Sequence, residues 1–289
     1  MVQAHKFYSI SKMPVTKGTL QVALTIAGSD PSGGAGIQAD LKTFTAIGVY
    51  AGAVISSLTV QNTKGVFAIQ PIDPPFVKDQ ITYVLSDLNV SHIKIGMLGS
   101  SSVAKSICEA LDDFKGEIIY DPVLVSTSGQ KLIDLAGYEA IRDEILGLCT
   151  VLTPNIQELS LLTKRNLTNK ESFLASAEIL LQQYGKLRSV IITGGHYAPE
   201  EPSITDYLLS LSNTSPQVKH NEISHPRIIS RNTHGTGCTF SAAFTAYHLL
   251  TGNDIEAFHK ATAYMDAIIK QSAPYRIGHG TGPLAHHLK

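Results

Sequence analysis

Residues 21–47 read QVALTIAGSDPSGGAGIQADLKTFTAI, and this stretch decides the fold class. An apolar run with β-branched residues, Gln21 to Ala27, stops at the turn-rich segment Gly28 to Gly34, which is the pattern of a strand followed by a loop. From Ala35 onward, apolar residues recur at helical spacing, at Ile37, Leu41, Phe44 and Ile47. The stretch therefore predicts a strand, a tight loop and a helix in direct succession.

The alternation of strand and helix patterns continues along most of the chain. Apolar strand patterns lie at 53–60, 92–95, 117–120, 150–152 and 189–193. Helical patterns lie between most of them, at 75–88, 103–114, 138–148 and 171–184. Short strands off this pattern are predicted at 66–72, 204–209 and 217–223, and helices at 237–250 and 254–271. Strands that alternate with helices predict a mainly parallel sheet covered on both faces.

The composition is that of a globular protein, with 43% hydrophobic and 16% charged residues among 289. No internal repeat or long linker divides the chain, so we expect a flexible amino-terminal arm, residues 1–20, and one α/β domain, residues 21–289. The three cysteines are widely separated and odd in number, which argues against a disulfide framework and fits a reducing compartment.

Charge and hydropathy narrow the choice of partners. The formal net charge of −1 gives no global basic field, so we expect neither nucleic acid nor an anionic membrane as a partner. No apolar run approaches the roughly 18 to 20 residues that span a bilayer, and the first 20 residues lack the apolar core of a secretory signal. These features favour a cytoplasmic protein. Residues 1–18 contain lysines and no acid, so an organellar transit peptide stays an alternative.

The first candidate for a functional motif is the glycine-rich loop from Gly28 to Gly36. Glycines let the backbone approach a ligand closely and let N–H groups point toward an anion. The spacing fits neither the dinucleotide-binding pattern G-x-G-x-x-G nor the P-loop pattern G-x-x-x-x-G-K-[ST]. Two interpretations remain for this loop, a binding site for a polar ligand and a tight connection between strand and helix.

The second candidate is the segment NTHGTGCT, residues 232–239, which opens a clean apolar helix. Its glycines, Gly235 and Gly237, let successive N–H groups face one point at a helix N-terminus, which forms an anion hole suited to phosphoryl transfer. Cys238 lies in the first turn, where the helix dipole lowers the pKa of a thiol, so it could accept a proton. The alternative for Cys238 is a small buried residue that packs under the helix.

Seven segments together resemble the hydroxymethylpyrimidine/phosphomethylpyrimidine kinase family. They are AGSDPSGGAGIQAD (27–40), QNT (61–63), KIGML (94–98), DPV (121–123), TPN (153–155), GGH (194–196) and NTHGTGCT (232–239). They occur in the family's order from about Leu24 to His286. The resemblance implies a ribokinase-like three-layer α/β/α sandwich, usually a homodimer. It also implies use of MgATP for two successive phosphorylations of the hydroxymethylpyrimidine precursor in thiamine biosynthesis.

The resemblance also implies a substrate pocket. The family's pyrimidine-reading glutamine falls on Gln61, whose amide offers a donor and an acceptor side by side. Gly28, Met97 and Val123 would wall the ring pocket, and Asp40 would lie close to it. The alternatives are a solvated strand end for Gln61 and core packing for Met97 and Val123. For Asp40 they are a solvated helix residue or a structural hydrogen-bond acceptor.

A magnesium and nucleotide site is implied by the same resemblance. Asp121 ends a predicted strand, and Asn155 with Glu158 resembles the superfamily's N-x-x-E motif for Mg²⁺ and phosphate. The alternative is a helix cap, in which Asn155 and Glu158 form a capping box. Thr193 and Thr236 would contact the nucleotide or its phosphates, although related kinases often carry lysine at Thr193 and at Thr127.

Two functional alternatives stay open beside the pyrimidine kinase. One is a pyridoxine or pyridoxal kinase of the same fold, because relatives with a cysteine at position 238 can resemble both groups. The other is a non-catalytic relative that binds the pyrimidine as a sensor or carrier. In the wider superfamily the place of Cys238 is usually an aspartate, so the resemblance implies that Cys238 is the base of the first phosphorylation.

Overall fold

The computed structural model describes residues 20–124, 132–133, 135–195, 197, 199–212 and 215–288. Within them lie eight helices, α1 (Gly36–Ile47), α2 (Pro74–Asp87), α3 (Ser101–Leu111), α4 (Leu135–Leu148), α5 (Ile156–Thr163), α6 (Lys170–Gln183), α7 (Thr236–Thr251) and α8 (Asp254–Ser272). The expected amino-terminal arm lies outside this part of the chain except for Leu20.

A single sheet forms the middle of the molecule. Over the described residues its strands are β1 (Val22–Ser29), β2 (Ala51–Asn62), β3 (Gly65–Pro71), β4 (Val90–Ile95), β5 (Glu117–Tyr120), β6 (Val151–Leu152), β7 (Ser189–Ile192), β8 (Ser203–Ser212) and β9 (Ser215–Pro226). Their order is β3-β2-β1-β4-β5-β6-β7-β8-β9. From β2 to β7 neighbouring strands are parallel, whereas β3, β8 and β9 are added antiparallel.

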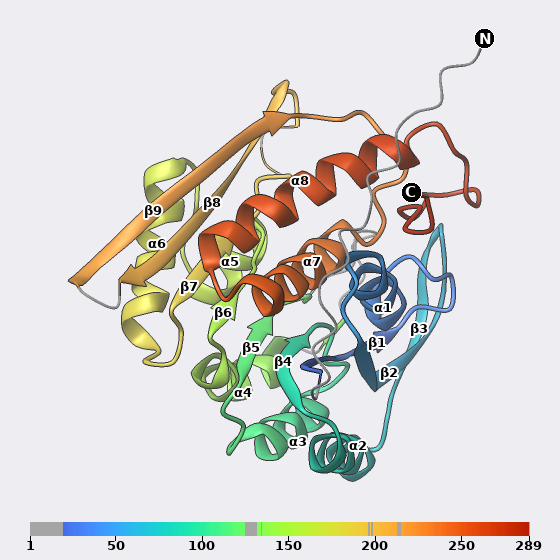
Figure 1. Ribbon diagram of the computed structural model, residues 1–289, viewed down its shortest axis with the longest axis vertical. Coiled ribbons are helices and arrows are strands. Elements are labelled where there is room, and N and C mark those ends of the chain that lie inside the picture. Colours follow the sequence, from blue (N-terminus) through green and yellow to red (C-terminus); the bar gives the residue numbers. More distant parts are fainter. Residues whose placement is uncertain are drawn as a thin grey trace.

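Helices cover both faces of this sheet (Figure 1). Side chains of neighbouring residues in a strand point to opposite faces, so Ile118 of β5 joins the core beneath α2 to α6, and Ile119 joins the core beneath α7 and α8. Phe44 of α1 packs with Ala242 of α7 in a third cluster on the α7 face. The predicted three-layer α/β/α sandwich with a mainly parallel sheet is confirmed.

The strand order reverses at β1, which pairs with β2 on one side and with β4 on the other. Ile26 of β1 lies opposite Ile95 of β4, and the register with β2 shifts between Ala27 and Gly28. In open α/β sheets, ligands bind beyond the carboxyl ends of the strands at such a reversal. The sheet therefore places its expected binding crevice next to Gly28.

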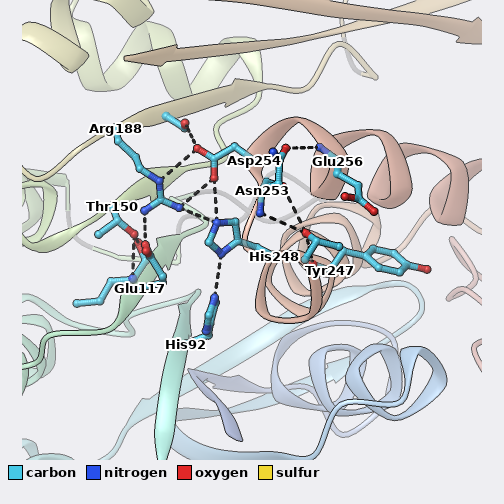
Figure 2. A network of polar contacts seen from close by, with 12 residues as sticks. His92, Glu117, Thr150, Arg188, Tyr247, His248, Asn253, Asp254 and Glu256 are labelled. Atoms are coloured by element: carbon cyan, nitrogen blue, oxygen red, sulfur yellow. Dashed lines mark hydrogen bonds and ion pairs between the residues drawn. The ribbon is translucent and has the colours of Figure 1, made fainter. Parts of the chain in front are cut away.

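The opposite, amino edge of the sheet carries a polar network that holds the end of α7 (Figure 2). His248 of α7 lies 2.9 Å from His92 of β4 between Nδ1 and Nε2, and its own Nε2 lies 3.1 Å from Asp254 Oδ1. Arg188 donates to His248 Nε2 at 3.0 Å, pairs with Asp254 at 2.9 Å, and pairs with Glu117 of β5. Helix α7 thus connects this network at the amino edge to the carboxyl edge of the sheet.

The described helices include none that is both long enough and apolar enough to span a bilayer.

Candidate active site

The predicted site residues follow strands that end at the same edge of the sheet. Gly28 lies at the end of β1, Met97 follows β4, Asp121 follows β5, Asn155 follows β6 and Thr193 follows β7. Because β1 and β4 to β7 run parallel, their carboxyl ends lie side by side. The structure therefore brings these five positions to one edge, as the sequence predicts.

The two glycine-rich segments meet at this edge. Gly235, the N-cap residue of α7, has φ 83°, and a Cβ atom there would lie 1.8 Å from the carbonyl oxygen of Gly34. Gly36, at the start of α1, has φ 56°, and a Cβ atom there would lie 2.2 Å from the carbonyl oxygen of Gly28. Only glycine permits both the backbone angle and the approach at these positions. The loop before α1 and the start of α7 therefore pack directly against each other.

The first turn of α7 opens into free space. A Cβ atom on Gly237 would meet no atom within 4 Å. The first N–H groups of a helix have no acceptor within the helix, and they carry its positive dipole end. Thr236 uses its hydroxyl to bind the Thr233 carbonyl oxygen at 3.1 Å. This open first turn fits the anion hole expected from the sequence, and the role itself stays a prediction.

A buried charged cluster lies beneath this turn. Lys94 of β4 pairs with Asp40 of α1 at 3.1 Å and lies 3.6 Å from Asp121 Oδ2, and these side chains are at most 4% exposed. Thr25 donates a hydrogen bond of 2.6 Å to Asp40. Asp40 is therefore not the solvated helix residue that the sequence left open, and it is a structural acceptor in the core. Lys94 was not among the predicted site residues.

Cys238 joins this cluster through its thiol. Part of the residue is exposed, but the thiol lies among the charges of Lys94, Asp121 and Asp40, which act on its ionisation. Burial raises the pKa of the Cys238 thiol to about 12. Asp121 and Asp40 add to this rise, whereas Lys94 opposes it. The expectation that the helix N-terminus makes this thiol acidic is wrong, because burial and two carboxylates outweigh the dipole.

A second polar group is centred on His234. Its Nε2 lies 2.8 Å from Asp30 Oδ2 and 3.1 Å from Gln61 Nε2. Gln61 is half-buried within β2, and so it is not a freely solvated strand end. His234 was quoted in the motif without a role, and its chemistry becomes visible only once the fold brings it to Gln61.

Asp30 shapes the first glycine-rich loop. Its carboxylate accepts hydrogen bonds from the N–H groups of Ser32, Gly34 and Ala35 at 2.8 to 3.1 Å. Burial alone would raise the pKa of Asp30, but hydrogen bonds from His234 and Ser32 outweigh it and lower the pKa to about 2. An ionised carboxylate thus holds the loop against His234 at neutral pH.

Gly28 and Met97 lie in close contact. A Cβ atom on Gly28 would lie 2.9 Å from Met97 Sδ, and Met97 is 8% exposed. Val123 is half-buried and follows the next strand, where its N–H binds the Asp121 carbonyl oxygen at 2.8 Å. Met97 therefore packs in the buried core, and the role of these three residues as walls of a ring pocket stays a prediction.

Asn155 and Glu158 form the capping box of α5. Asn155 Oδ1 accepts from the Glu158 N–H at 2.9 Å, and Glu158 Oε2 accepts from the Asn155 N–H at 2.8 Å. Thr193 lies beside Asn155 in a parallel bridge, with its N–H bound to the Pro154 carbonyl oxygen at 3.0 Å. The helix-cap interpretation is confirmed, and the two predicted nucleotide residues are neighbours. Thr127 and His196 lie outside the described residues.

The carboxylates of Asp121 and Glu158 fit a Mg²⁺ ion that takes most of its ligands from water and nucleotide phosphates. Burial and the neighbouring Asp121 raise the pKa of Glu158 to about 8, and burial raises that of Asp121 to about 6. Asp121 Oδ2 is buried without a hydrogen-bond partner. In the described part of the chain, no three His, Cys, Asp or Glu side chains could hold a metal ion together. Mg²⁺ commonly binds through one or two carboxylates, waters and nucleotide phosphates.

Comparisons with known proteins agree with this geometry. The family model for phosphomethylpyrimidine kinase matches residues 30–285. The hydroxymethylpyrimidine/phosphomethylpyrimidine kinase of Rhizobium meliloti (strain 1021) is 40% identical over 265 residues, 92% of this chain and 96% of that relative. The crystal structure of phosphomethylpyrimidine kinase from Clostridium difficile 630 is 35% identical with a TM-score of 0.72, covering 86% of this chain and 98% of that one.

A pyridoxal kinase is also similar in structure. The ADP complex of Bacillus subtilis pyridoxal kinase has a TM-score of 0.80 at 29% identity, and it covers 93% of this chain and 98% of that one. Two findings identify the family: the match to the family model, and the similarity to a relative over nearly its whole length. The chain belongs to the phosphomethylpyrimidine kinase family.

Proposed function

We propose that the chain transfers a phosphoryl group from ATP to the hydroxymethyl group of 4-amino-5-hydroxymethyl-2-methylpyrimidine, and then a second one to the monophosphate, in thiamine biosynthesis. One observation carries this proposal. His234 contacts Gln61, and the open turn at Gly237 lies three residues further along the chain. The proposed ring-reading amide and the proposed anion hole would therefore lie next to each other.

The roles of the residues follow from this arrangement. Gln61 would pair with the ring nitrogen and exocyclic amine, while Gly28, Met97 and Val123 would enclose the ring. Gly235, Thr236 and Gly237 would surround the phosphoryl group with N–H donors, which stabilise the charge that spreads over its oxygens. Asn155 and Thr193 would line the nucleotide side.

Asp121 and Glu158 would hold Mg²⁺ together with the nucleotide. When bound, the ion would offset the charge of the phosphates. Both carboxyl groups have raised pKa values because they are buried near other acids, and a cation would relieve that repulsion. We keep Cys238 as the proposed base for the first step. The negative charge of Asp121 raises the pKa of its thiol, so a cation that offsets this charge would ease removal of the proton.

A substrate panel tests the function. ADP release should depend on hydroxymethylpyrimidine or its monophosphate, and pyridoxine or pyridoxal should support much slower turnover. Loss of the amide in Gln61→Leu nearly retains the side-chain size but leaves ring polar groups unsatisfied, at about 1–3 kcal/mol each. The variant should therefore fold normally and lose roughly tenfold or more in kcat/KM for the pyrimidine. Unchanged kcat/KM would remove Gln61 from the pocket.

Pyridoxal phosphorylation is the second candidate, favoured by the TM-score of 0.80 with the pyridoxal kinase of Bacillus subtilis. Turnover of pyridoxal equal to or faster than that of the pyrimidine would establish it. Absence of turnover with every one of these alcohols, combined with measurable pyrimidine binding, would instead favour a non-catalytic carrier. We also propose a cytoplasmic homodimer, which light scattering of the purified chain and fractionation of cells would test.

A further inference from the structure

The amide of Gln61 lies between two polar side chains that have fixed hydrogen-bonding roles. Gln61 and Thr59 are two residues apart on β2, and their side chains lie within hydrogen-bonding distance although the register with β3 shifts between Val60 and Gln61. Gln61 Oε1 lies 3.2 Å from Thr59 Oγ1, and Gln61 Nε2 lies 3.1 Å from His234 Nε2. The oxygen and nitrogen of an amide occupy nearly the same space, so their order follows from the neighbours.

Thr59 can act only as an acceptor toward Gln61. A threonine hydroxyl has a single hydrogen and two lone pairs. Thr59 Oγ1 lies 2.9 Å from the Ser29 carbonyl oxygen, which can only accept, and this contact is shorter than the one to Gln61. The hydrogen therefore belongs to the Ser29 contact, and a lone pair of Thr59 faces the amide.

His234 can act only as a donor toward Gln61. Its Nε2 lies 2.8 Å from Asp30 Oδ2, and the Asp30 carboxylate already accepts three backbone N–H groups. A carboxylate in this state offers no hydrogen, so Nε2 must carry one. His234 Nε2 must carry a hydrogen whether the imidazole ring is neutral or protonated. A nitrogen that carries a hydrogen cannot accept from the Gln61 NH₂ group.

We infer that Thr59 and His234, with Asp30 behind it, lock the Gln61 amide with Oε1 toward His234 and Nε2 toward Thr59. A half-turn about the last side-chain bond reaches this state and exchanges two atoms of similar size. The NH₂ group of Gln61 then donates to Thr59, and Gln61 Oε1 faces the one hydrogen on His234 Nε2, which it shares with Asp30, the closer acceptor. Thr59, His234 and Asp30 are thus positioning residues that set the donor–acceptor order of the pocket.

The lock determines how a ring can dock, and this consequence rests on the proposed function. A 4-aminopyrimidine presents an amine donor beside a ring-nitrogen acceptor. Its amine must face Oε1 on the His234 side, and its ring nitrogen must face Nε2 on the Thr59 side. The 4-oxo analogue presents an acceptor beside an N–H donor, which is the reverse order. It can pair with the amide only in the opposite ring orientation, which turns the hydroxymethyl group away from the anion hole.

The first test uses nuclear magnetic resonance on the unmodified protein. Long-range ¹H–¹⁵N spectra assign which ring nitrogen of His234 carries hydrogen. We expect a hydrogen on Nε2 at neutral pH. A neutral ring with hydrogen only on Nδ1 would overturn the inference, because Nε2 would then accept from the amide. This measurement does not depend on turnover, so it remains decisive if the proposed substrate is wrong.

The second test compares kcat/KM for the 4-amino and 4-oxo forms of 5-hydroxymethyl-2-methylpyrimidine. In Thr59→Val and His234→Phe the ratio of amino to oxo should fall at least about tenfold, equivalent to about 1.4 kcal/mol. The matched variants Thr59→Ser and His234→Gln keep the hydroxyl and a donor, and they should restore most of the ratio. An unchanged ratio in both disruptive variants would overturn the lock. Failure of the unmodified protein to use either pyrimidine would instead count against the proposed function.

Discussion

Gly235 and Gly237 lie two residues apart, but only Gly235 is confined by its surroundings. Gly235→Ala would combine φ 83° with a contact of 1.8 Å to the Gly34 carbonyl oxygen. We expect a loss of about 3 kcal/mol or more, which corresponds to about 6 °C or more in Tm. Gly237→Ala is the matched control, because its methyl group meets free space. It should keep Tm and lower kcat, since the methyl group enters the space proposed for phosphate. Thermal unfolding and initial rates separate the two effects.

Replacement of Cys238 tests the proposed base. Positioned base catalysis contributes about 10²- to 10⁴-fold in rate, so Cys238→Ala and Cys238→Ser should lower kcat of the first phosphorylation by that order. The second acceptor is an ionised phosphate that needs no strong base, so its rate should fall less. Quenched-flow analysis with each acceptor gives both rates. Equal losses in the two steps would assign Cys238 to shaping of the anion hole.

The sequence predicts which residues come together at the site, but it does not predict their protonation states. A helix N-terminus contributes about 0.3–1 kcal/mol, less than about one pKa unit, whereas full burial shifts a pKa by up to 3–5 units. The thiol of Cys238 is buried, and its pKa rises accordingly. Lys94 escaped prediction because its partner Asp40 lies 54 residues earlier in the chain. No local pattern reveals such a pairing.

Among the elements, α5 and α6 both begin with an asparagine capping box, and the asparagine of α5, Asn155, lies beside Thr193 at the proposed nucleotide site. Asn155→Ala and the control Asn169→Ala should each cost about 1 kcal/mol of stability. Only Asn155→Ala should also raise the KM for ATP. Denaturant titrations and ATP saturation curves measure the two quantities. A KM for ATP that rises equally in both variants would mean that Asn155 acts through stability alone.

Most elements were predicted within a few residues, because apolar periodicity follows burial. The lengths of the two strands of the edge hairpin were underestimated. The sequence predicts strands at 204–209 and 217–223. In the structure β8 extends over Ser203–Ser212 and β9 over Ser215–Pro226. Antiparallel pairing between the two strands continues through polar residues beyond the predicted ranges, such as Ser210 and Ser224. This pairing needs no apolar side chain, so hydropathy alone does not show where it ends.

For the whole molecule, the network at the amino edge predicts an acid-sensitive fold. Burial lowers the pKa of His92 to about 4. His248 and Arg188 lower it further, whereas Glu117 opposes them. The unfolded chain binds a proton near pH 6.5 and the folded chain only near pH 4, so stability falls as the pH drops between these values. The loss is on the order of 2–3 kcal/mol.

His92→Gln removes this titration and should flatten the dependence of Tm on pH between about 6.5 and 4. His259→Gln is the control, since His259 is exposed on α8. Its curve should follow that of the unmodified protein. Equal slopes for His92→Gln and the unmodified protein would show that His92 is not the group that titrates.

Asp30 and His234 are separated by 204 residues, and this separation has a consequence for synthesis of the protein. At about 5–20 residues per second, a ribosome needs roughly 10–40 s to travel from one to the other. During that time Gln61 has emerged, but His234 and the anion hole do not yet exist. The nascent chain therefore has no complete pocket, and its substrate cannot assist its folding until almost the last helix has been made.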